Sequence, residues 1–232
     1  MSTRRAESLQ RIGAAVAGQI TDGALLGLGS GSTVASLLPS IAREMKKRGV
    51  LRSRWVPTSI QIQLEAQKVG FELSPLTRAG VDLVLDGADQ VDEKLNLIKG
   101  GGGALLKEKV LLSNTKMSII VADERKFAKR LCDNGVRVPV EASPFAREPL
   151  SRRLRELGGE PILRLDQRGF PFYTESGNVI LDTLFEPIQR PAALERQVKT
   201  TPGVVEVGIF CIRPLEVYRL EEDRGFRTLR KR

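Results

Sequence analysis

Apolar positions along the first half of the chain follow two spacings that alternate with each other. Stretches with apolar residues three or four positions apart predict amphipathic helices, and short runs of consecutive apolar residues predict buried strands. The predicted helices cover residues 6–20, 33–47, 60–69 and 105–112, and the predicted strands cover residues 24–28, 54–56, 81–85 and 116–121. Strands that alternate with helices are typical of a parallel, doubly wound sheet. The sequence therefore predicts an α/β fold built on a mostly parallel sheet.

The pattern changes in the second half of the chain, where the predicted strands become shorter. Strands are expected over 136–142, 162–165, 172–173, 179–184 and 204–210, and helices over 144–157 and 191–200. This β-α-β-β-α-β order indicates a second, smaller α+β domain. The last apolar segments, 217–220 and 227–229, are expected to rejoin the first sheet. We therefore predict a first domain over 1–131 that is completed by about 213–232, and a small domain over 132–212.

The composition is that of a globular protein. Apolar residues make up 41 % of the chain, enough for a sizeable core. No apolar run reaches the roughly 18 residues of a membrane-spanning helix, and no apolar segment of a secretory signal follows the N-terminus. We therefore expect a cytoplasmic protein without a membrane partner. The two cysteines, Cys132 and Cys211, are too few for a disulfide framework or a thiolate metal cluster, so we interpret both as small buried apolar residues.

Histidine is absent from the chain, and this limits the chemistry more than any other feature of the composition. Its absence excludes Ser-His-Asp and Cys-His nucleophilic machinery, histidine metal sites and a histidine general base. A proton-transfer base must then be a carboxylate, a lysine or a tyrosine.

The net charge of +9 suits an anionic partner such as nucleic acid, a membrane surface or a small anionic substrate. The basic residues are spread along the chain, with clusters only at Lys46-Lys47-Arg48 and in the tail Arg227 to Arg232. Aromatic residues, which stack on the bases of single strands, are few and are not interleaved with the charge. We therefore favour a basic, soluble surface or an anion-attracting cleft over nucleic-acid binding.

A glycine-rich motif, Gly27-Leu28-Gly29-Ser30-Gly31-Ser32-Thr33, lies between a predicted strand and a predicted helix. In a doubly wound sheet such a loop sits at the carboxyl end of its strand, where ligands bind. Glycine lets backbone N–H groups approach an anion, the helix N-terminus adds positive potential, and Ser30, Ser32 and Thr33 add hydroxyl donors. The motif is neither the dinucleotide fingerprint, which needs glycine at position 32, nor a Walker A loop. It indicates a phosphate site, with a capped turn that binds nothing as the alternative.

A pair of aspartates, in Asp86-Gly87-Ala88-Asp89, follows directly after the apolar residues 83–85. Both carboxylates are expected to face the same crevice as the glycine-rich loop, because the carboxyl ends of parallel strands meet at one edge of a sheet. The alternatives are an Asx turn without function and a metal pair. The metal pair is less favoured, since histidine and further clustered carboxylates are absent.

Lys99 is followed by four consecutive glycines, Gly100 to Gly103, and then by an apolar helix. Four glycines lose much entropy when they are ordered, so a flexible linker is one interpretation. The apolar residues on both sides favour a backbone that wraps closely around a ligand and presents N–H groups to a developing oxyanion. Lys99 would add charge stabilisation there. Glu108 lies about one turn into the helix, and its spacing leaves open whether it faces the crevice or solvent.

Together these groups suit one class of reaction. A phosphate cradle can anchor a small sugar whose hydroxyl groups contact two aspartates. A lysine and glycine N–H groups can stabilise an oxyanion, and a glutamate can move a proton. This is the equipment of aldose–ketose isomerisation through an enediolate.

The motifs continue along nearly the whole chain. They comprise Gly27 to Thr33, Val56-Pro57-Thr58-Ser59, Asp86 to Asp89, Lys99 with its glycine run, Glu108-Lys109, Ala122-Asp123-x-x-Lys126, Val138-Pro139-Val140-Glu141, Leu157-Gly158-Gly159, Gly177 to Asp182 and Pro202-Gly203-Val204-Val205. In this order and spacing they closely resemble the ribose-5-phosphate isomerase A family. The resemblance implies a Rossmann-like domain with a small, ferredoxin-like α+β domain. It also implies the interconversion of D-ribose 5-phosphate and D-ribulose 5-phosphate in the non-oxidative pentose phosphate pathway.

The resemblance further implies roles for individual residues. The catalytic residues would be Glu108 as the base, with Asp86, Asp89 and Lys99. The substrate-binding residues would be Ser30, Gly31, Ser32, Thr33, Asp86, Gly87, Ala88, Asp89, Lys99, Gly100, Gly101, Gly102 and Lys126. No metal or organic cofactor is implied. Members of the family form homodimers or homotetramers, and we expect the small domain to be involved in oligomerisation.

The chain departs from the family near its N-terminus, where some members carry a lysine close to the substrate phosphate. A gapless count back from the glycine-rich loop places Leu9 there, with Gln10 next, and Arg5 and Arg11 are nearby cations. Ser30 stands where some relatives have threonine, which keeps the hydroxyl group. The stretch from Pro214 to Arg232 matches poorly.

Three rival functions suit the sequence less well than isomerisation. A sugar-phosphate-sensing domain without catalysis would not need Glu108 and Lys99, and both are present. A relative of coenzyme A transferases would use a glutamate but needs a larger cleft than this short chain readily provides. Nucleic-acid binding rests on charge alone.

Overall fold

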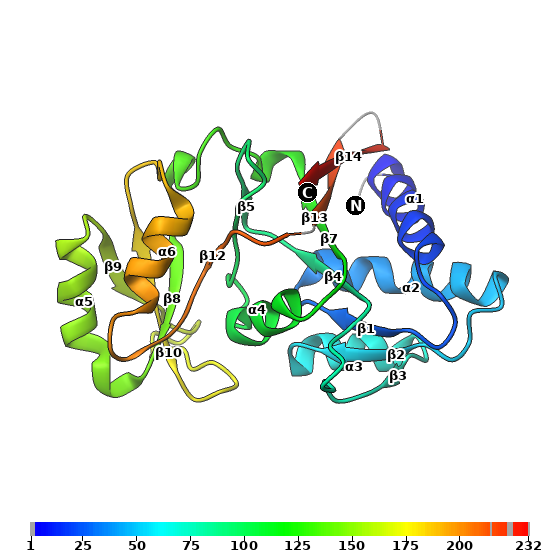
Figure 1. Ribbon diagram of the computed structural model, residues 1–232, viewed down its shortest axis with the longest axis horizontal. Coiled ribbons are helices and arrows are strands. Elements are labelled where there is room, and N and C mark those ends of the chain that lie inside the picture. Colours follow the sequence, from blue (N-terminus) through cyan, green and yellow to red (C-terminus); the bar gives the residue numbers. More distant parts are fainter. Residues whose placement is uncertain (1–2, 214, 222–224, 232) are drawn as a thin grey trace. The chain divides into compact units, whose positions relative to one another are not determined.

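A computed structural model describes residues 3–213, 215–221 and 225–231 (Figure 1). These residues form two compact units, each with a hydrophobic core of its own. The first unit contains the described residues up to Gly87, Lys107–Arg125 and those from Ile212 onward, and the second contains Ala88–Leu106 and Lys126–Cys211. The chain therefore passes from one unit to the other within the Asp86–Asp89 motif and again just before Glu108.

The first unit is built on a seven-stranded sheet with the order β14-β13-β7-β4-β1-β2-β3. Its strands are β1 (Leu25–Leu28), β2 (Arg54–Pro57), β3 (Glu72–Leu73), β4 (Leu83–Gly87), β7 (Ser118–Asp123), β13 (Leu215–Glu221) and β14 (Gly225–Lys231). Neighbouring strands are parallel, except that β14 is antiparallel to β13. Counted along the chain, the parallel strands of this sheet lie in the order 3-2-1-4-5-6, which is that of the doubly wound fold. The predicted fold class is therefore confirmed, and the switch point lies between β1 and β4.

Helices alternate with these strands close to the predicted positions. They are α1 (Thr3–Gly18), α2 (Ser32–Lys47), α3 (Ile60–Lys68) and α4 (Leu105–Ser113). The apolar faces of α1, α2 and α3 share one core with Trp55 of β2, whose ring stacks on Phe71 with 4.3 Å between the centroids. Helices α1 and α2 approach closely at Gly13, where an added Cβ would lie 1.7 Å from the Ser40 hydroxyl. This packing fixes α2 and the loop that leads into it.

The second unit contains a four-stranded antiparallel sheet with the order β11-β8-β10-β9. The elements follow the chain as β8 (Val138–Ala142), α5 (Arg147–Glu156), β9 (Glu160–Leu163), β10 (Val179–Leu184), α6 (Pro191–Lys199) and β11 (Val204–Val207). Both helices pack on one face of this sheet, where Leu150 and Val198 share a core with Val138 and Val140. The predicted β-α-β-β-α-β arrangement is thus present. Cys132 is buried in this core, but Cys211, which was expected to be buried, is partly exposed at its margin.

A small three-stranded sheet of the second unit was not predicted from the sequence. It consists of β5 (Gln90–Val91), β6 (Leu97–Ile98) and β12 (Ile209–Phe210), in the order β12-β6-β5. Strands of two residues are too short for the alternation of apolar and polar positions to reveal them. The expected strand 204–210 is accordingly divided into β11 and β12 at Gly208, and the expected strand 172–173 is reduced to an isolated bridge between Tyr173 and Val179.

The compact units differ from the predicted domains mainly at residues 88–106, which the sequence assigned to the first domain. These residues pack with the second unit because β6 pairs with β12, with Ile98 opposite Ile209. In the first sheet β13 pairs with β7, and β14 pairs with β13 at the edge. Of the segments expected to belong to the first domain, residues 1–2, 214, 222–224 and 232 lie outside the described residues.

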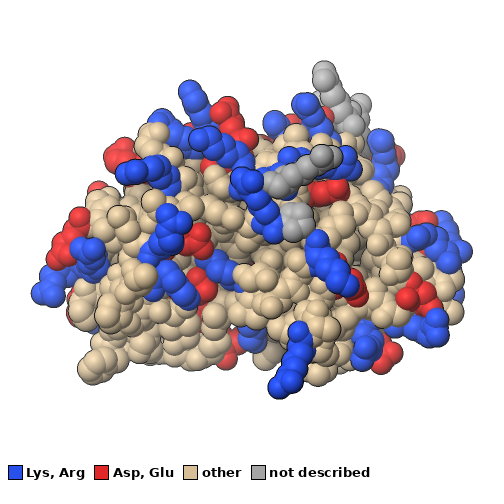
Figure 2. Space-filling model, in the orientation of Figure 1, with Lys and Arg blue, Asp and Glu red and all other residues tan. Residues whose placement is uncertain are grey.

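The charge is scattered over the face of the molecule that Figure 2 shows. On the face shown in Figure 2, lysine and arginine side chains are interspersed with acidic ones and do not gather into one patch. Among the described residues, none of the helices combines the length and the apolar character needed to cross a membrane.

Candidate active site

The loop after β1 lies at the switch point of the first sheet. The Gly29 N–H donates to the Leu85 carbonyl of β4 (2.8 Å), and an added Cβ at Gly29 would lie 1.8 Å from the Asp86 carboxylate. Gly31 precedes α2 with φ 113° and ψ 166°, a conformation that side-chain-bearing residues rarely adopt. The loop therefore needs glycine at both positions. It directs the N-terminus of α2, with Ser32 and Thr33, to the carboxyl edge of the sheet.

Hydroxyl groups from the loop after β2 support this first loop. The Ser30 Oγ lies 2.8 Å from Thr58 Oγ1 and donates to Ser59 Oγ at 2.7 Å. The Thr58 hydroxyl also donates to the Leu28 carbonyl, and Ser59 caps α3 by accepting from the Ile62 N–H. Thr58 and Ser59 belong to the Val56–Ser59 motif but were not among the predicted site residues. The Val56–Ser59 motif is the feature of the sequence that could have identified these two residues.

Asp86 and Glu108 are both buried in the first unit. Asp86 is the last residue but one of β4 and has no exposed surface, and its Oδ1 accepts from the Gly87 N–H at 2.7 Å. Glu108 on α4 is only 4 % exposed, so it does not face solvent, the alternative that its spacing had left open.

The direction of α4 places Glu108 relative to the sheet. The Val81 N–H, just before β4, donates to the carbonyl of Asn114, just after α4, so α4 runs antiparallel to β4. A Cβ added at Gly27 of β1 would lie 3.0 Å from the Leu111 side chain. Glu108 is one turn before Leu111 on the same helix face. It therefore lies toward the carboxyl ends of β1 and β4, the end at which Asp86 is found.

A hairpin of β5 and β6 brings Asp89 and Lys99 together in the second unit. The Asp89 N–H donates to the Ile98 carbonyl at 2.8 Å, so Asp89 and Lys99 lie at the same end of the hairpin. Lys99 is 3 % exposed, and its Nζ lies 5.7 Å from the centroid of the Phe210 ring. The backbone N–H of Lys99 donates to the Gly208 carbonyl at 2.9 Å. A Cβ at Gly208 would block this close approach.

The glycine run is an ordered turn and not a linker. Gly100 has φ 107° and Gly103 has φ 80°, and the Gly103 N–H donates to the Gly100 carbonyl at 3.0 Å. A Cβ at Gly103 would meet the Phe172 ring at 2.7 Å, and the Gly101 N–H donates to Asp89 Oδ2 at 2.8 Å. Gly102 differs from these residues, because a Cβ there would meet no atom within 4 Å.

Cations lie at the carboxyl end of β7 and just beyond it. In the second unit, the Lys126 ammonium donates to the Ala88 carbonyl at 2.6 Å, beside Asp89. In the first unit, Asp123 pairs with Arg125 and Arg5. The hydrogen bond from Arg125, and to a smaller extent that from Arg5, holds the pKa of Asp123 well below its usual range against the opposing effect of burial.

The predicted residues thus fall into two sets. In the first unit, the loop Ser30–Thr33, Asp86 and Glu108 lie at the carboxyl edge of the doubly wound sheet. In the second unit, Ala88, Asp89, Lys99, the glycine run and Lys126 surround the β5–β6 hairpin. Among the described residues, no group of three or more histidine, cysteine, aspartate or glutamate side chains is placed to hold a metal ion. The fold and these buried acid and base groups define a doubly wound α/β enzyme.

Comparisons with known proteins identify the kind of enzyme. The family described as Ribose 5-phosphate isomerase A (phosphoriboisomerase A) matches residues 54–224. The chain belongs to this family, which confirms the family, the fold class and the isomerase activity inferred from the sequence. Ribose-5-phosphate isomerase A of Methanosarcina acetivorans is 43 % identical over 201 residues, 86 % of this chain and 84 % of that protein. The protein of the same name from Thermosynechococcus vestitus is 39 % identical over 203 residues, 87 % of this chain and 86 % of that protein.

Solved structures agree with this assignment. Ribose 5-phosphate isomerase A from Methanocaldococcus jannaschii has a TM-score of 0.87 at 33 % identity, over 97 % of this chain and 99 % of that one. A D-ribose-5-phosphate isomerase in complex with phospho-erythronic acid has a TM-score of 0.88 at 34 % identity, with the same shares covered.

Proposed function

We propose that this chain interconverts D-ribose 5-phosphate and D-ribulose 5-phosphate with Glu108 as the proton-transfer base. The main support is the burial of Glu108 on the face of α4 that packs on the sheet, toward the end at which Asp86 lies. Fully buried aspartate, glutamate and lysine are rare unless they are paired or functional. Asp86, Lys99 and Glu108 are 0 %, 3 % and 4 % exposed, and all three lie in the predicted motifs.

The reaction moves one hydrogen between neighbouring carbons of the open-chain sugar. The Glu108 carboxylate takes the proton from C2 while the C1 carbonyl oxygen becomes an oxyanion, which gives a cis-enediolate. The O2 hydroxyl proton passes to O1, and Glu108 returns its proton to C1 as the C2 carbonyl forms. One base on one face of the enediolate performs both transfers, so no histidine is required.

The remaining groups bind the sugar and stabilise its charge. The ammonium of Lys99 and the N–H groups of Gly100 and Gly102 stabilise the oxyanion. Asp86 and Asp89 hydrogen-bond the sugar hydroxyls and assist ring opening. The Gly101 N–H supports this role, because it orients the Asp89 carboxylate.

The phosphate binds at the N-terminus of α2 through Ser30, Gly31, Ser32 and Thr33. A helix N-terminus offers N–H groups and positive potential to an anion, and Gly31 allows close backbone approach. Gly87 and Ala88 contact the substrate between the two aspartates, and Lys126 assists binding from beside Ala88. The complex of a related isomerase with phospho-erythronic acid supports a phosphorylated sugar acid as a probe for this site.

Replacement of Glu108 tests the assignment of the base. Glu108→Gln keeps the shape of the side chain and removes its basicity, so we expect kcat to fall by about 10²–10⁴-fold, the typical contribution of a positioned base. The KM should change much less, and exchange of the substrate C2 proton with solvent should fall in parallel with kcat. Glu65→Gln, at a partly exposed residue of α3 that pairs with Lys68, is the control. A Glu108→Gln enzyme that keeps more than about a tenth of kcat would mean that another residue is the base.

The proposed chemistry uses neither a metal nor an organic cofactor, because carboxylates and a lysine supply every proton transfer and charge contact. Activity should therefore survive exhaustive dialysis against a chelator. If activity is lost and Mg²⁺ or Zn²⁺ restores it, a metal takes part in the reaction.

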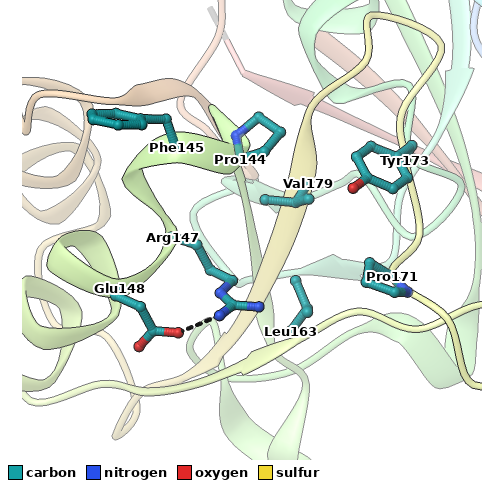
Figure 3. Close-up of a pocket in the computed structure, with 8 residues that line it drawn as sticks. All are labelled: Pro144, Phe145, Arg147, Glu148, Leu163, Pro171, Tyr173 and Val179. Carbon is teal, nitrogen blue, oxygen red and sulfur yellow. Dashed lines mark ion pairs between the residues drawn. The ribbon is translucent and has the colours of Figure 1, made fainter.

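We also propose that the second unit forms the contact between copies in a homodimer or homotetramer. A groove of about 330 Å³ in this unit is lined in part by Phe145, Leu163, Tyr173 and Val179 (Figure 3). Phe145 is 98 % exposed and Tyr173 is 57 % exposed. Exposed aromatic residues are typical of the centres of protein interfaces. The Arg147–Glu148 ion pair beside the groove carries both signs of charge, which suits a contact with a symmetry-related copy.

The cellular setting follows from the substrate. Phosphorylated sugars are charged and do not cross bilayers readily, so we place the activity in the cytoplasm, with neither membrane nor nucleic acid as a partner. A sensing domain without catalysis is the weaker alternative, since it would have no use for a buried base.

A further inference from the structure

Arg164, which follows β9 in the second unit, has a guanidinium group fixed on several sides. Its Nε donates to Asp182 Oδ2 at 2.8 Å and its Nη2 donates to Asp182 Oδ1 at 2.5 Å. The guanidinium carbon lies 5.8 Å from the centroid of the Phe172 ring. The backbone is held as well, because the Arg164 N–H donates to the Ile180 carbonyl and the Phe172 N–H donates to the Arg164 carbonyl. The side chain of Arg164 is only 15 % exposed.

The third nitrogen of this guanidinium holds the glycine run. Arg164 Nη1 donates to the Gly100 carbonyl at 2.9 Å and to the Gly101 carbonyl at 3.0 Å. In a trans peptide unit, the C=O of one residue and the N–H of the next point in opposite directions. The N–H groups of Gly101 and Gly102 are therefore directed away from Arg164. The Gly101 N–H confirms this direction, because it donates to Asp89 Oδ2 on the other side.

We propose that Arg164 is a positioning residue for the isomerisation. It holds the Gly101 N–H on the Asp89 carboxylate, and it aims the Gly102 N–H at the same side of the glycine run, where the oxyanion forms. The inference rests on the function proposed above for the glycine run. Glycines have the largest backbone freedom of all residues, and donors stabilise a transition state best when they are oriented in advance. Arg164 supplies that orientation, and Asp182 balances its charge. Lysine cannot replace it, because an ammonium lacks the planar fork that spans two carbonyls and a carboxylate.

Arg164→Met tests the proposal, because it keeps an unbranched apolar side chain over Phe172 and removes every donor. We expect kcat to fall by roughly 10²-fold, the effect of misplacing reacting groups by about an ångström. The carboxylate of phospho-erythronic acid imitates the charge of the enediolate, so the Kd of this compound should rise by a larger factor than the KM for ribose 5-phosphate. We call the Kd of phospho-erythronic acid divided by the KM for ribose 5-phosphate the affinity ratio. A purely structural loss would lower the amount of active enzyme and leave the affinity ratio unchanged. The pH profile of kcat should keep its position, since the substitution leaves the proposed base, Glu108, in place.

Arg168 offers a matched control in the same unit. It also pairs with an aspartate, Asp166, and lies over an aromatic ring, that of Phe170, but its guanidinium group donates to Asp166 and not to the glycine run. Arg168→Met should therefore leave kcat and the affinity ratio at the parent values. Arg164→Lys should recover little of the activity, because it restores the charge but not the two carbonyl contacts. If Arg164→Met is too unstable to purify, Arg164→Lys and Asp182→Asn provide the same ratio.

Failure of the role proposed for Arg164 and failure of the function proposed for the glycine run give different results. An Arg164→Met enzyme, or failing that an Arg164→Lys enzyme, with parent kcat and an unchanged affinity ratio overturns the positioning role. If Gly102→Ala impairs catalysis at the same time, the glycine run still acts in the reaction and only the role of Arg164 is wrong. If Gly102→Ala also has parent activity, the function proposed for the run is wrong as well.

Discussion

The four glycines after Lys99 serve different purposes, which only their surroundings reveal. Gly100 and Gly103 need their positive φ angles, and Gly103 also needs the space against Phe172. Gly101 sits against Asp89, where an added Cβ would lie 2.8 Å from its Oδ1. Gly102 has neither constraint: a Cβ there meets open space and its φ is not in the left-handed region. If that space belongs to the substrate, the reason for glycine at 102 is close approach to the ligand.

Gly102→Ala tests that reason. The free protein should be as stable as the parent or slightly more so, because a compatible Gly→Ala change stabilises by about 0.4–1 kcal/mol through the unfolded chain. The kcat/KM for ribose 5-phosphate should nevertheless fall by roughly 10²-fold, since a methyl group displaces the reacting carbons by about an ångström. Gly18→Ala is the control, because its Cβ also meets nothing within 4 Å. Thermal melts and steady-state assays of both variants decide the matter, and parent activity in Gly102→Ala would contradict close approach.

At the scale of elements, the sequence predicted most of the framework and less of the site. Helices and strands with several turns or several buried residues, such as α2 and β7, follow the apolar spacing closely. The β5–β6 hairpin escaped prediction because each strand has two residues, yet it is the element that brings Asp89 and Lys99 together. The burial of Glu108 was equally hidden, because it depends on the packing of α4 over Gly27 and not on spacing within the helix.

The loop that precedes α2 carries a prediction at this scale. Gly31→Val should weaken substrate binding, because valine strains the backbone at φ 113° and keeps the N–H groups away from the phosphate. The loss of a charge-assisted contact of about 1.5–3 kcal/mol corresponds to a rise in KM of roughly tenfold or more. Gly23→Val, at φ 82° in the turn before β1, imposes a similar strain away from the loop and should affect stability without affecting KM. Equal KM values for Gly31→Val and the parent would place the phosphate elsewhere.

At the scale of the whole molecule, the chain does not complete one unit before it begins the other. It leaves the first unit after Gly87, returns at Lys107 and leaves again after Arg125. The first two crossings fall inside the motifs to which we assign the chemistry, so Asp86 and Asp89, which we propose to act on one substrate, belong to different units. The pattern of predicted elements changes only after about residue 131. A boundary made by pairing short strands that are distant in the sequence leaves no trace in such local patterns. The sequence therefore predicted two domains but not residues 88–106 in the second.

Association of copies is the remaining property of the whole molecule that can be tested. We expect the parent protein to sediment at micromolar concentration as a dimer or tetramer of the 25.5 kDa chain. Phe145→Glu places a charge on the most exposed aromatic side chain of the second unit, so burying it in an interface would require desolvating an unpaired carboxylate. This variant should shift toward the 25.5 kDa species. Leu51→Glu, at an apolar residue of the first unit that is 73 % exposed, should keep the parent mass. A parent protein that sediments only as single chains would contradict oligomerisation, and dissociation by Leu51→Glu alone would place the contact on the first unit.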